Sequence, residues 1–183
     1  HATGTITGPL SGAGIPEPGD AVGFAPLGER VFAVRSTGGR LFYSVWVEDV
    51  GQPNAALDNQ VWSIATNANG DIVGTPSLEI ASIWQNPGTP SNPIADIDFD
   101  DNCCMLLAER GLNGDTSTSP HIGHVRRYCW GDDPLTGAFG WSLDPTQFSI
   151  GGAGSTNSVG GVGWEGAPNN TVWAMGDAIV IDW

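Results

Sequence analysis

The sequence predicts an all-β protein, and three observations support this fold class. Glycine and proline supply 27 and 13 of the 183 residues, well above their usual combined share of about 12%, and both favour turns over helices. Apolar runs of four to eight residues, rich in β-branched and aromatic types, alternate with Gly, Asn, Asp and Pro clusters, as strands alternate with turns. No segment of ten residues shows the apolar periodicity of a helix.

The order of apolar runs and turns recurs with a period of about 64 residues. A shift of this size places Arg30–Val34 on Ile94–Asp98 and Leu41–Val45 on Met105–Glu109. Self-similarity at a fixed period is typical of repeat architectures. The predicted parts are an N-terminal segment with two weak strands, two complete blade-like repeats and one partial repeat, at residues 1–30, 31–94, 95–158 and 159–183.

Each complete repeat is expected to contain four short strands joined by polar, glycine-rich turns. In the first repeat the expected strands are 31–34, 40–47, 60–65 and 71–80. In the second they are 95–99, 104–109, 124–130 and 138–150, with an interruption at Pro145. The run 104–109 has the apolar content of a helical turn, but it is short and Gly111 ends it, so we expect a strand there.

Four antiparallel strands per repeat are typical of a β-propeller blade. Two complete blades and parts of a third are too few for closure, because closed propellers have about four to eight blades. We therefore expect a propeller that is incomplete as a single chain, with a β-sandwich as the alternative fold. Open edges at 1–30 and 159–183 would pair with each other or with another chain, since an unpaired strand edge attracts a partner strand.

A hairpin pattern recurs in four segments, Asn92–Asp100, Met105–Gly111, Ser158–Val162 and Val172–Asp177. These segments resemble the propeller-type β repeats of large bacterial secreted and surface proteins, in which a D-I-x-F-D-x-x-G-x-M-L-L-A-E-R-G hairpin recurs. The resemblance implies a blade architecture and an exported setting, and it implies no activity. Cys103 occupies the position of the turn glycine in that pattern, although cysteine tolerates a positive φ poorly.

The charge balance excludes several functions. Twenty acidic residues stand against six basic ones, all of them arginine, for a net charge of −14. A basic nucleic-acid face and lysine chemistry are therefore excluded, and no apolar stretch approaches the roughly 18 residues of a transmembrane segment. The sequence opens at His1 without an initiator Met, so we expect a processed chain or a fragment of a longer one.

Three cysteines allow one internal disulfide. Cys104 opens the second strand of its repeat and Cys129 lies near the end of the third, and antiparallel pairing would bring these ends together. The expected disulfide is Cys104–Cys129, with Cys103–Cys129 as the alternative. Disulfides persist in oxidising compartments, so we expect a secreted, periplasmic or cell-surface protein.

Closely spaced acidic residues define a candidate calcium site. Alternating carboxylates on a strand share one face, and Asp and Asn side chains at the next turn add oxygen ligands of the kind that Ca²⁺ prefers. The candidate ligands are Asp96, Asp98, Asp100, Asp101 and Asn102. The glycine and closing glutamate of an EF-hand are missing, and the competing interpretation is a solvated strand edge followed by a turn.

Eight tryptophans in an acidic chain suggest a sugar-binding surface. Trp84, Trp130 and Trp141 lie at strand ends or in loops, where their rings would stack on the apolar face of a glycan. Tryptophans within strand runs, such as Trp46 and Trp173, are expected to pack between blades instead.

The sequence favours a non-enzymatic structural or interaction module of an exported or cell-surface assembly. It would bind partner subunits through blade edges and loops, as a homo-oligomer or as a subunit of a larger complex. The alternative is a tryptophan-using lectin that binds a glycan. A third hypothesis is an enzyme, either calcium-dependent or with a copper histidine brace of His1 and His121 or His124. No Gly-x-Ser-x-Gly elbow is present, so no catalytic triad is predicted.

Overall fold

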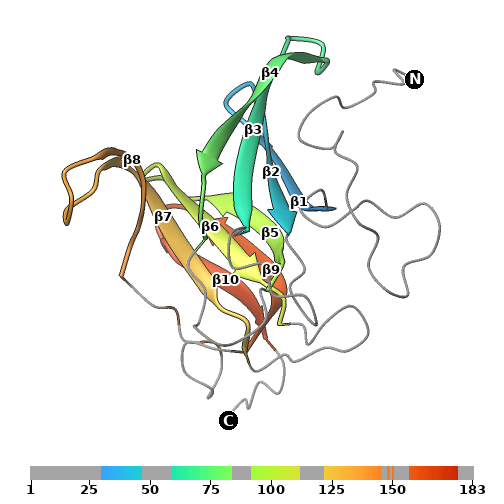
Figure 1. Cartoon of the computed structure of the whole chain (residues 1–183). Helices are drawn as coiled ribbons and strands as arrows, with labels where there is room; N and C mark the ends of the chain where they lie inside the picture. The colour runs from blue at the N-terminus through green and yellow to red at the C-terminus, as the bar shows by residue number, and fades with distance from the viewer. Residues whose placement is uncertain are drawn as a thin grey trace, which may run out of the picture. The chain divides into compact units, whose positions relative to one another are not determined.

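The computed structural model of the chain describes residues 30–46, 59–83, 92–111, 122–145, 148, 150 and 157–176. Ten strands form three antiparallel sheets in this part of the chain, and it contains no α-helix (Figure 1). The predicted all-β fold is confirmed. None of the three sheets closes on itself. Both weak strands predicted in the segment 1–30 lie outside the described residues.

The chain divides into two compact units, His1–Ser91 and Asn92–Trp183. The first unit contains one four-stranded sheet with the order β1-β2-β3-β4. Its strands are β1 Arg30–Thr37, β2 Arg40–Trp46, β3 Gln60–Thr66 and β4 Ile72–Ile80. Gly38 and Gly39 join the first two strands with φ of 55° and 72°, as a two-residue type I′ hairpin requires.

Both faces of the sheet of the first unit carry buried apolar side chains. Tyr43, Val45 and Ile64 form a buried cluster on one face, and partly buried Leu41 and Trp62 pack against it. Side chains alternate between faces along a strand, so Arg40 and Ser63 lie on the other face, which also carries the buried side chains of Phe42, Trp46 and Val61. There the Nε of Arg40 donates to the Oγ of Ser63 over 3.0 Å, and this hydroxyl donates to the Oε1 of Glu79.

The second unit contains a four-stranded sheet and a hairpin. The four strands, in the order β5-β6-β7-β8, are β5 Ile94–Phe99, β6 Cys104–Glu109, β7 Val125–Asp132 and β8 Phe139–Leu143. The hairpin consists of β9 Ser158–Glu165 and β10 Thr171–Gly176. The expected strand at 104–109 is confirmed, whereas the expected run 138–150 is strand, among its described residues, only over β8.

The core of the second unit lies around β6. Met105, Leu106 and Leu107 are fully buried, so β6 is covered on both faces. Ala108 and Val125, which are paired across β6 and β7, join Ile150 in a buried cluster. Partly buried residues of the hairpin pack against this cluster, namely Val162, Val172 and Ala174. Burial of this apolar surface is the main force that holds the hairpin on the sheet.

Across the described ranges, no helix is long and apolar enough to cross a membrane.

Candidate functional site

A disulfide joins the two central strands of the β5–β8 sheet. Cys104 and Cys129 lie directly opposite each other in the register of β6 and β7, with their Cα atoms 4.0 Å apart and a bond between their sulfur atoms. The predicted pairing is confirmed. Cys103 keeps a free, exposed thiol.

Cys103 sits in the turn between β5 and β6 with a φ of 61°. This left-handed conformation costs a residue with a Cβ about 1–2 kcal/mol. The turn therefore has the backbone shape that favours glycine at this position, as the resemblance implies, and a cysteine occupies it. The Cys103 carbonyl accepts a hydrogen bond from the backbone N–H of Trp130 over 3.3 Å, which fixes the turn against the end of β7.

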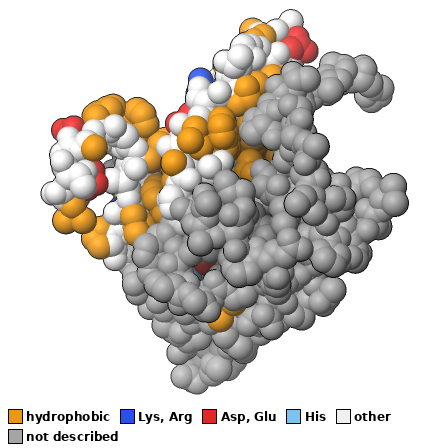
Figure 2. All heavy atoms as spheres, viewed as in Figure 1, with side chains coloured by type: hydrophobic (Ala, Val, Ile, Leu, Met, Phe, Trp, Pro, Cys, Tyr) orange, Lys and Arg blue, Asp and Glu red, His pale blue; other side chains and the backbone are white. Residues whose placement is uncertain are grey.

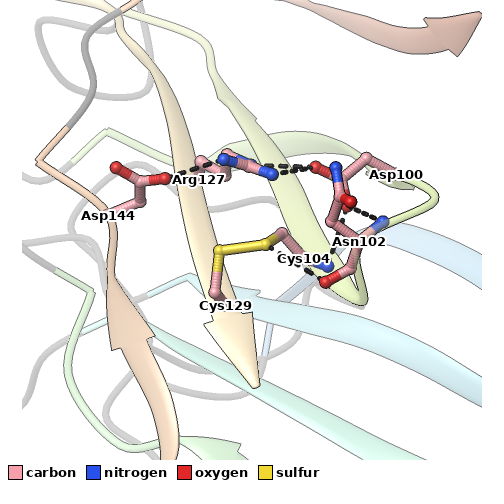
Figure 3. A network of polar contacts seen from close by, with 6 residues as sticks. All are labelled: Asp100, Asn102, Cys104, Arg127, Cys129 and Asp144. Carbon is pink, nitrogen blue, oxygen red and sulfur yellow. Dashed lines mark hydrogen bonds and ion pairs between the residues drawn. A yellow bond between two sulfur atoms is a disulfide. The ribbon is translucent and has the colours of Figure 1, made fainter. Parts of the chain in front are cut away.

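The carboxylate of Asp100 organises this turn and ties it to the neighbouring strands (Figure 3). Its Oδ1 accepts the backbone N–H groups of Asn102 and Cys104, over 2.8 and 3.0 Å. Its Oδ2 contacts the Nε and Nη2 of Arg127, over 2.8 and 2.6 Å. The Nη1 of Arg127 in turn donates to Asp144 Oδ2 over 2.8 Å. The network therefore joins the ends of β5 and β8 through β7.

This network favours the charged form of the Arg127 guanidinium. Partial burial opposes the charged guanidinium, but the hydrogen bonds and negative charges of Asp100 and Asp144 outweigh burial and raise the pKa of Arg127. Charge-assisted hydrogen bonds of this kind are about twice as strong as neutral ones. The contacts of Arg127 with Asp100 and Asp144 therefore stabilise the sheet.

Asp96 and Asp98 connect β5 to β9. The Oδ2 of Asp96 accepts the N–H of Val162 over 3.0 Å, and the Oδ2 of Asp98 accepts the N–H of Trp164 over 2.7 Å. The two partners are 66 residues apart in both bonds. A step of two residues along β5 therefore matches a step of two residues in the same direction along β9, so the two strands run parallel. Gly160 permits the close approach at the start of β9, because a Cβ there would lie 2.6 Å from the Cβ of Ala95.

Three of the four carboxylates of the candidate calcium site are therefore engaged elsewhere. Asp96 and Asp98 bind backbone amides of β9, and Asp100 binds Arg127. Asp101 and Asn102 are exposed in the turn. Among the described residues, no group of three or more His, Cys, Asp or Glu side chains is placed to hold a metal ion. Calcium binding stays a prediction that these contacts do not favour.

A buried ion pair at the end of β6 was not predicted from the sequence. The Oε1 of Glu109 lies 2.6 Å from the Nε of Arg126, and the two side chains are only 5% and 9% exposed. The Oε2 of Glu109 accepts the N–H of His124 and the Nδ2–H of Asn92, over 3.0 and 3.3 Å. A glutamate that closes a fully apolar strand was the available signal, because a buried carboxylate requires a cationic partner.

Aromatic rings follow one another across the sheet and out along the β7–β8 hairpin. We call Phe99, Trp141, Trp130 and Phe139 the ring row. Successive ring centroids are 6.3, 5.4 and 5.1 Å apart. Exposure rises toward the hairpin tip, to 49% for Trp130 and 68% for Phe139. The structure thus brings together two of the three tryptophans predicted to stack on a ligand.

Other predicted residues fall elsewhere. Trp84, His1 and His121 lie outside the described residues, and His124 is buried beside Glu109. The copper brace and the contribution of Trp84 stay predictions. Of the tryptophans expected to pack within the fold, Trp46 is buried, whereas Trp173 is 62% exposed and donates from Nε1 to Glu165. Trp173 lies on the outer strand of the hairpin, so no further described strand of that sheet lies beside it.

Comparison with known proteins gives no family assignment: no family model matches the chain, and neither a curated protein nor a solved structure matches it.

Proposed function

We propose that this chain is a structural and interaction module of an exported or cell-surface assembly. It is built from propeller-type blades, and a strand from a partner subunit completes the β9–β10 sheet. One observation carries the proposal: the hairpin has one edge closed by side chains of β5 and one edge, that of β10, without a paired described strand.

Three features support the blade interpretation. In both four-stranded sheets, neighbouring strands are consecutive in the chain, which is the strand order of a blade. In the first hairpin of each sheet, the last paired residue before the turn is Thr37, Phe99 or Glu165. These three positions are separated by roughly equal lengths of sequence. In addition, the first strands of the second and third sheets, β5 and β9, run parallel, as the innermost strands of neighbouring blades do.

The hydrogen-bonding pattern of the hairpin identifies its open edge. The N–H groups of Val162 and Trp164 point away from β10, because they donate to carboxylates of β5. In an antiparallel pair, residues directly opposite each other both point toward the partner strand or both point away. Ala174 and Val172, which lie opposite these two residues, therefore direct their N–H and C=O groups outward.

The sequence of β10 does not protect this edge. Thr171–Gly176 contains no charged residue and no proline, although natural edge strands are commonly blocked by Lys or Pro. The one register shift of the hairpin lies near its end, between Ala174 and Gly176. Trp173 and Met175 on this strand are each 62% exposed. A strand added by a partner would pair with the outward groups and cover part of these side chains.

The Cys104–Cys129 disulfide supports the exported setting, because such bonds persist mainly outside the reducing cytosol.

Native mass spectrometry of the protein from its natural source tests the proposal. We expect an assembly heavier than one 19.0 kDa chain, and slow hydrogen exchange at the amides of Val172 and Ala174 within it. Trp173→Lys places a charge on the edge while keeping every main-chain hydrogen bond, and it should dissociate the assembly. Ala68→Lys, in the exposed turn between β3 and β4, is the control on another surface. A stable monomer of 19.0 kDa would contradict the proposal.

A further inference from the structure

Exposed hydrophobic side chains cover the hairpin of β7 and β8. Trp130 and Phe139 are about half to two thirds exposed, and Leu135 at the turn is almost fully exposed. Figure 2 shows hydrophobic side chains gathered over this hairpin, at the left of the view. Single exposed hydrophobic residues are common, but contiguous aromatic ones mark sites of interaction.

Asp132 belongs to the same surface. It lies directly opposite Phe139 in the register, and side chains of directly opposite residues share a face, with Cβ atoms about 5 Å apart. Trp130, two residues earlier on β7, is on that face as well. Among the described residues, no hydrogen bond or ion pair engages the Asp132 carboxylate. The neighbouring Asp133 differs, because it accepts from the Leu135 N–H and the Thr136 hydroxyl.

The charge of the chain favours a cationic ligand at this surface. The protein carries a net charge of −14 with only six basic residues. Three of these, Arg40, Arg126 and Arg127, are already neutralised by carboxylates. A field of this sign attracts basic partners and repels acidic ones.

We propose that Trp130, Phe139 and Asp132 form a docking site for an arginine or lysine side chain of a basic partner protein. The aliphatic stem of that side chain packs on the two rings. Its charged end lies over the Trp130 ring, the aromatic type that binds cations best, and pairs with the Asp132 carboxylate. This site is separate from the β10 edge, so the two proposals stand or fall independently.

A neutral sugar fits the same surface less well. Its hydroxyl groups point outward all around the ring and need several polar side chains for recognition. In the register of β7 and β8, the side chains that share a face with the exposed rings are those of Tyr128, Asp132, Trp141 and Leu143, and among these only Asp132 is charged. The Thr136 hydroxyl at the turn is bonded to Asp133. One carboxylate among apolar groups matches one positive charge on an apolar stem.

Titration of the full chain with two blocked pentapeptides tests the proposal. One peptide carries two arginines and the other carries glutamines in their place. We expect the arginine peptide to shift the NMR signals of the Trp130 indole and the Asp132 amide, and the glutamine peptide to leave them unchanged. Raising the salt concentration from about 0.05 to 0.5 M should weaken the binding, because salt screens exposed charge pairs.

Variants separate the contributions of charge and ring. Asp132→Asn should lower the affinity for the arginine peptide about two- to fivefold at low salt, and Phe139→Ala should lower it by a similar factor. Phe32→Ala, which removes a partly exposed aromatic ring of β1, is the matched control and should bind as the unaltered chain does. Asp132→Asn changes no described contact, so it tests the site even if Phe139→Ala fails to fold.

Three outcomes would overturn the proposal. In the first, the arginine peptide produces no shifts or shifts spread evenly over the acidic surface. In the second, Asp132→Asn binds the peptide unchanged. In the third, a neutral oligosaccharide such as cellohexaose shifts the Trp130 indole signal in a salt-independent way while the arginine peptide does not, and the ring row then binds a glycan.

Discussion

The β1–β4 and β5–β8 sheets share strand order and pairing, yet the side chains of their first strands make different contacts with other elements. β1 contains no acidic residue, and its Val31, Phe32 and Val34 side chains are well exposed. β5 carries Asp96 and Asp98, both of which bind backbone amides of β9. Within the described residues, the first strand of this topology is thus joined to a further hairpin in the sheet where it carries two aspartates.

The polar side chains of the two sheets differ in the same way. In the first sheet, Arg40 is about one third exposed and lies 3.6 Å from Glu79. In the second, Arg126 and Glu109 form a tight ion pair that is almost completely buried, and a disulfide joins the same two strands. We infer that the second sheet is the more rigid element and that its stability depends more strongly on single side chains.

The largest expected effect comes from breaking the buried ion pair. Arg126→Met leaves the Glu109 carboxylate buried without its cation, and we expect a loss of about 3–5 kcal/mol in the free energy of unfolding. Arg40→Met is the matched change in the first sheet, where solvent screens the pair, and it should cost less than about 1 kcal/mol. Urea denaturation measures both. Equal losses in the two variants would remove the contrast between the sheets.

Removal of the disulfide should have the next largest effect. Cys104→Ala combined with Cys129→Ala opens a loop closed over 25 residues, and we expect a loss of about 2–4 kcal/mol. Hydrogen exchange should accelerate in β6 and β7 and stay unchanged in β2 and β3. Cys103→Ala, which removes only the free thiol, is the control. If the double variant exchanges like this control, the disulfide contributes nothing to the rigidity of the second sheet.

The junction between β5 and β9 should respond to smaller changes. Asp96→Ala or Asp98→Ala removes the acceptor of one backbone amide of β9, and we expect each to cost about 1–3 kcal/mol. The direct measurement is hydrogen exchange at the amides of Val162 and Trp164, which should speed up selectively. Asp101→Ala, an exposed carboxylate in the adjoining turn, should leave both amides protected. Unchanged protection in the Asp96 and Asp98 variants would show that apolar packing alone holds the hairpin.

The smallest expected effect is a gain in stability at the turn of the second sheet. Cys103→Gly relieves a cysteine held at a φ of 61°, and we expect a gain of about 0.5–1 kcal/mol after the added freedom of the unfolded chain is subtracted. The control is Asn170→Gly at a φ of 48°, where the gain should be close to zero because asparagine tolerates this conformation. A destabilised Cys103→Gly variant would show that the thiol makes favourable contacts in the turn.

Much of the local structure could be predicted from the sequence. The strands were recognisable because short β-branched and aromatic runs between turn residues are a local pattern. The Cys104–Cys129 pairing followed from the same pattern, since neighbouring antiparallel strands bring the ends of their runs together. The predicted run 138–150 has its interruption at Pro145, two residues beyond the end of β8 at Leu143, and the described residues Phe148 and Ile150 are not in a strand.

The roles of the charged residues could not be predicted in this way. The carboxylates of Asp96 and Asp98 look alike whether they bind Ca²⁺, face solvent or cap a strand, and the deciding partners lie 66 residues further along the chain. The ring row was foreseen only in part, because the contact of Phe99 with Trp141 spans several strands of the sheet.

Composition and local pattern are enough to predict the all-β class, the strand segments, the acidic charge and the disulfide, because propensity, turn chemistry and net charge depend on nearby residues or on composition. The packing of distant strands sets the contact of Glu109 with Arg126, and it places Asp96 and Asp98 along one edge of the β9–β10 hairpin while no described strand pairs with β10 at the other. The physical reason is that a hydrogen bond or ion pair depends on a few ångströms between groups, and only the packing of distant strands sets that distance.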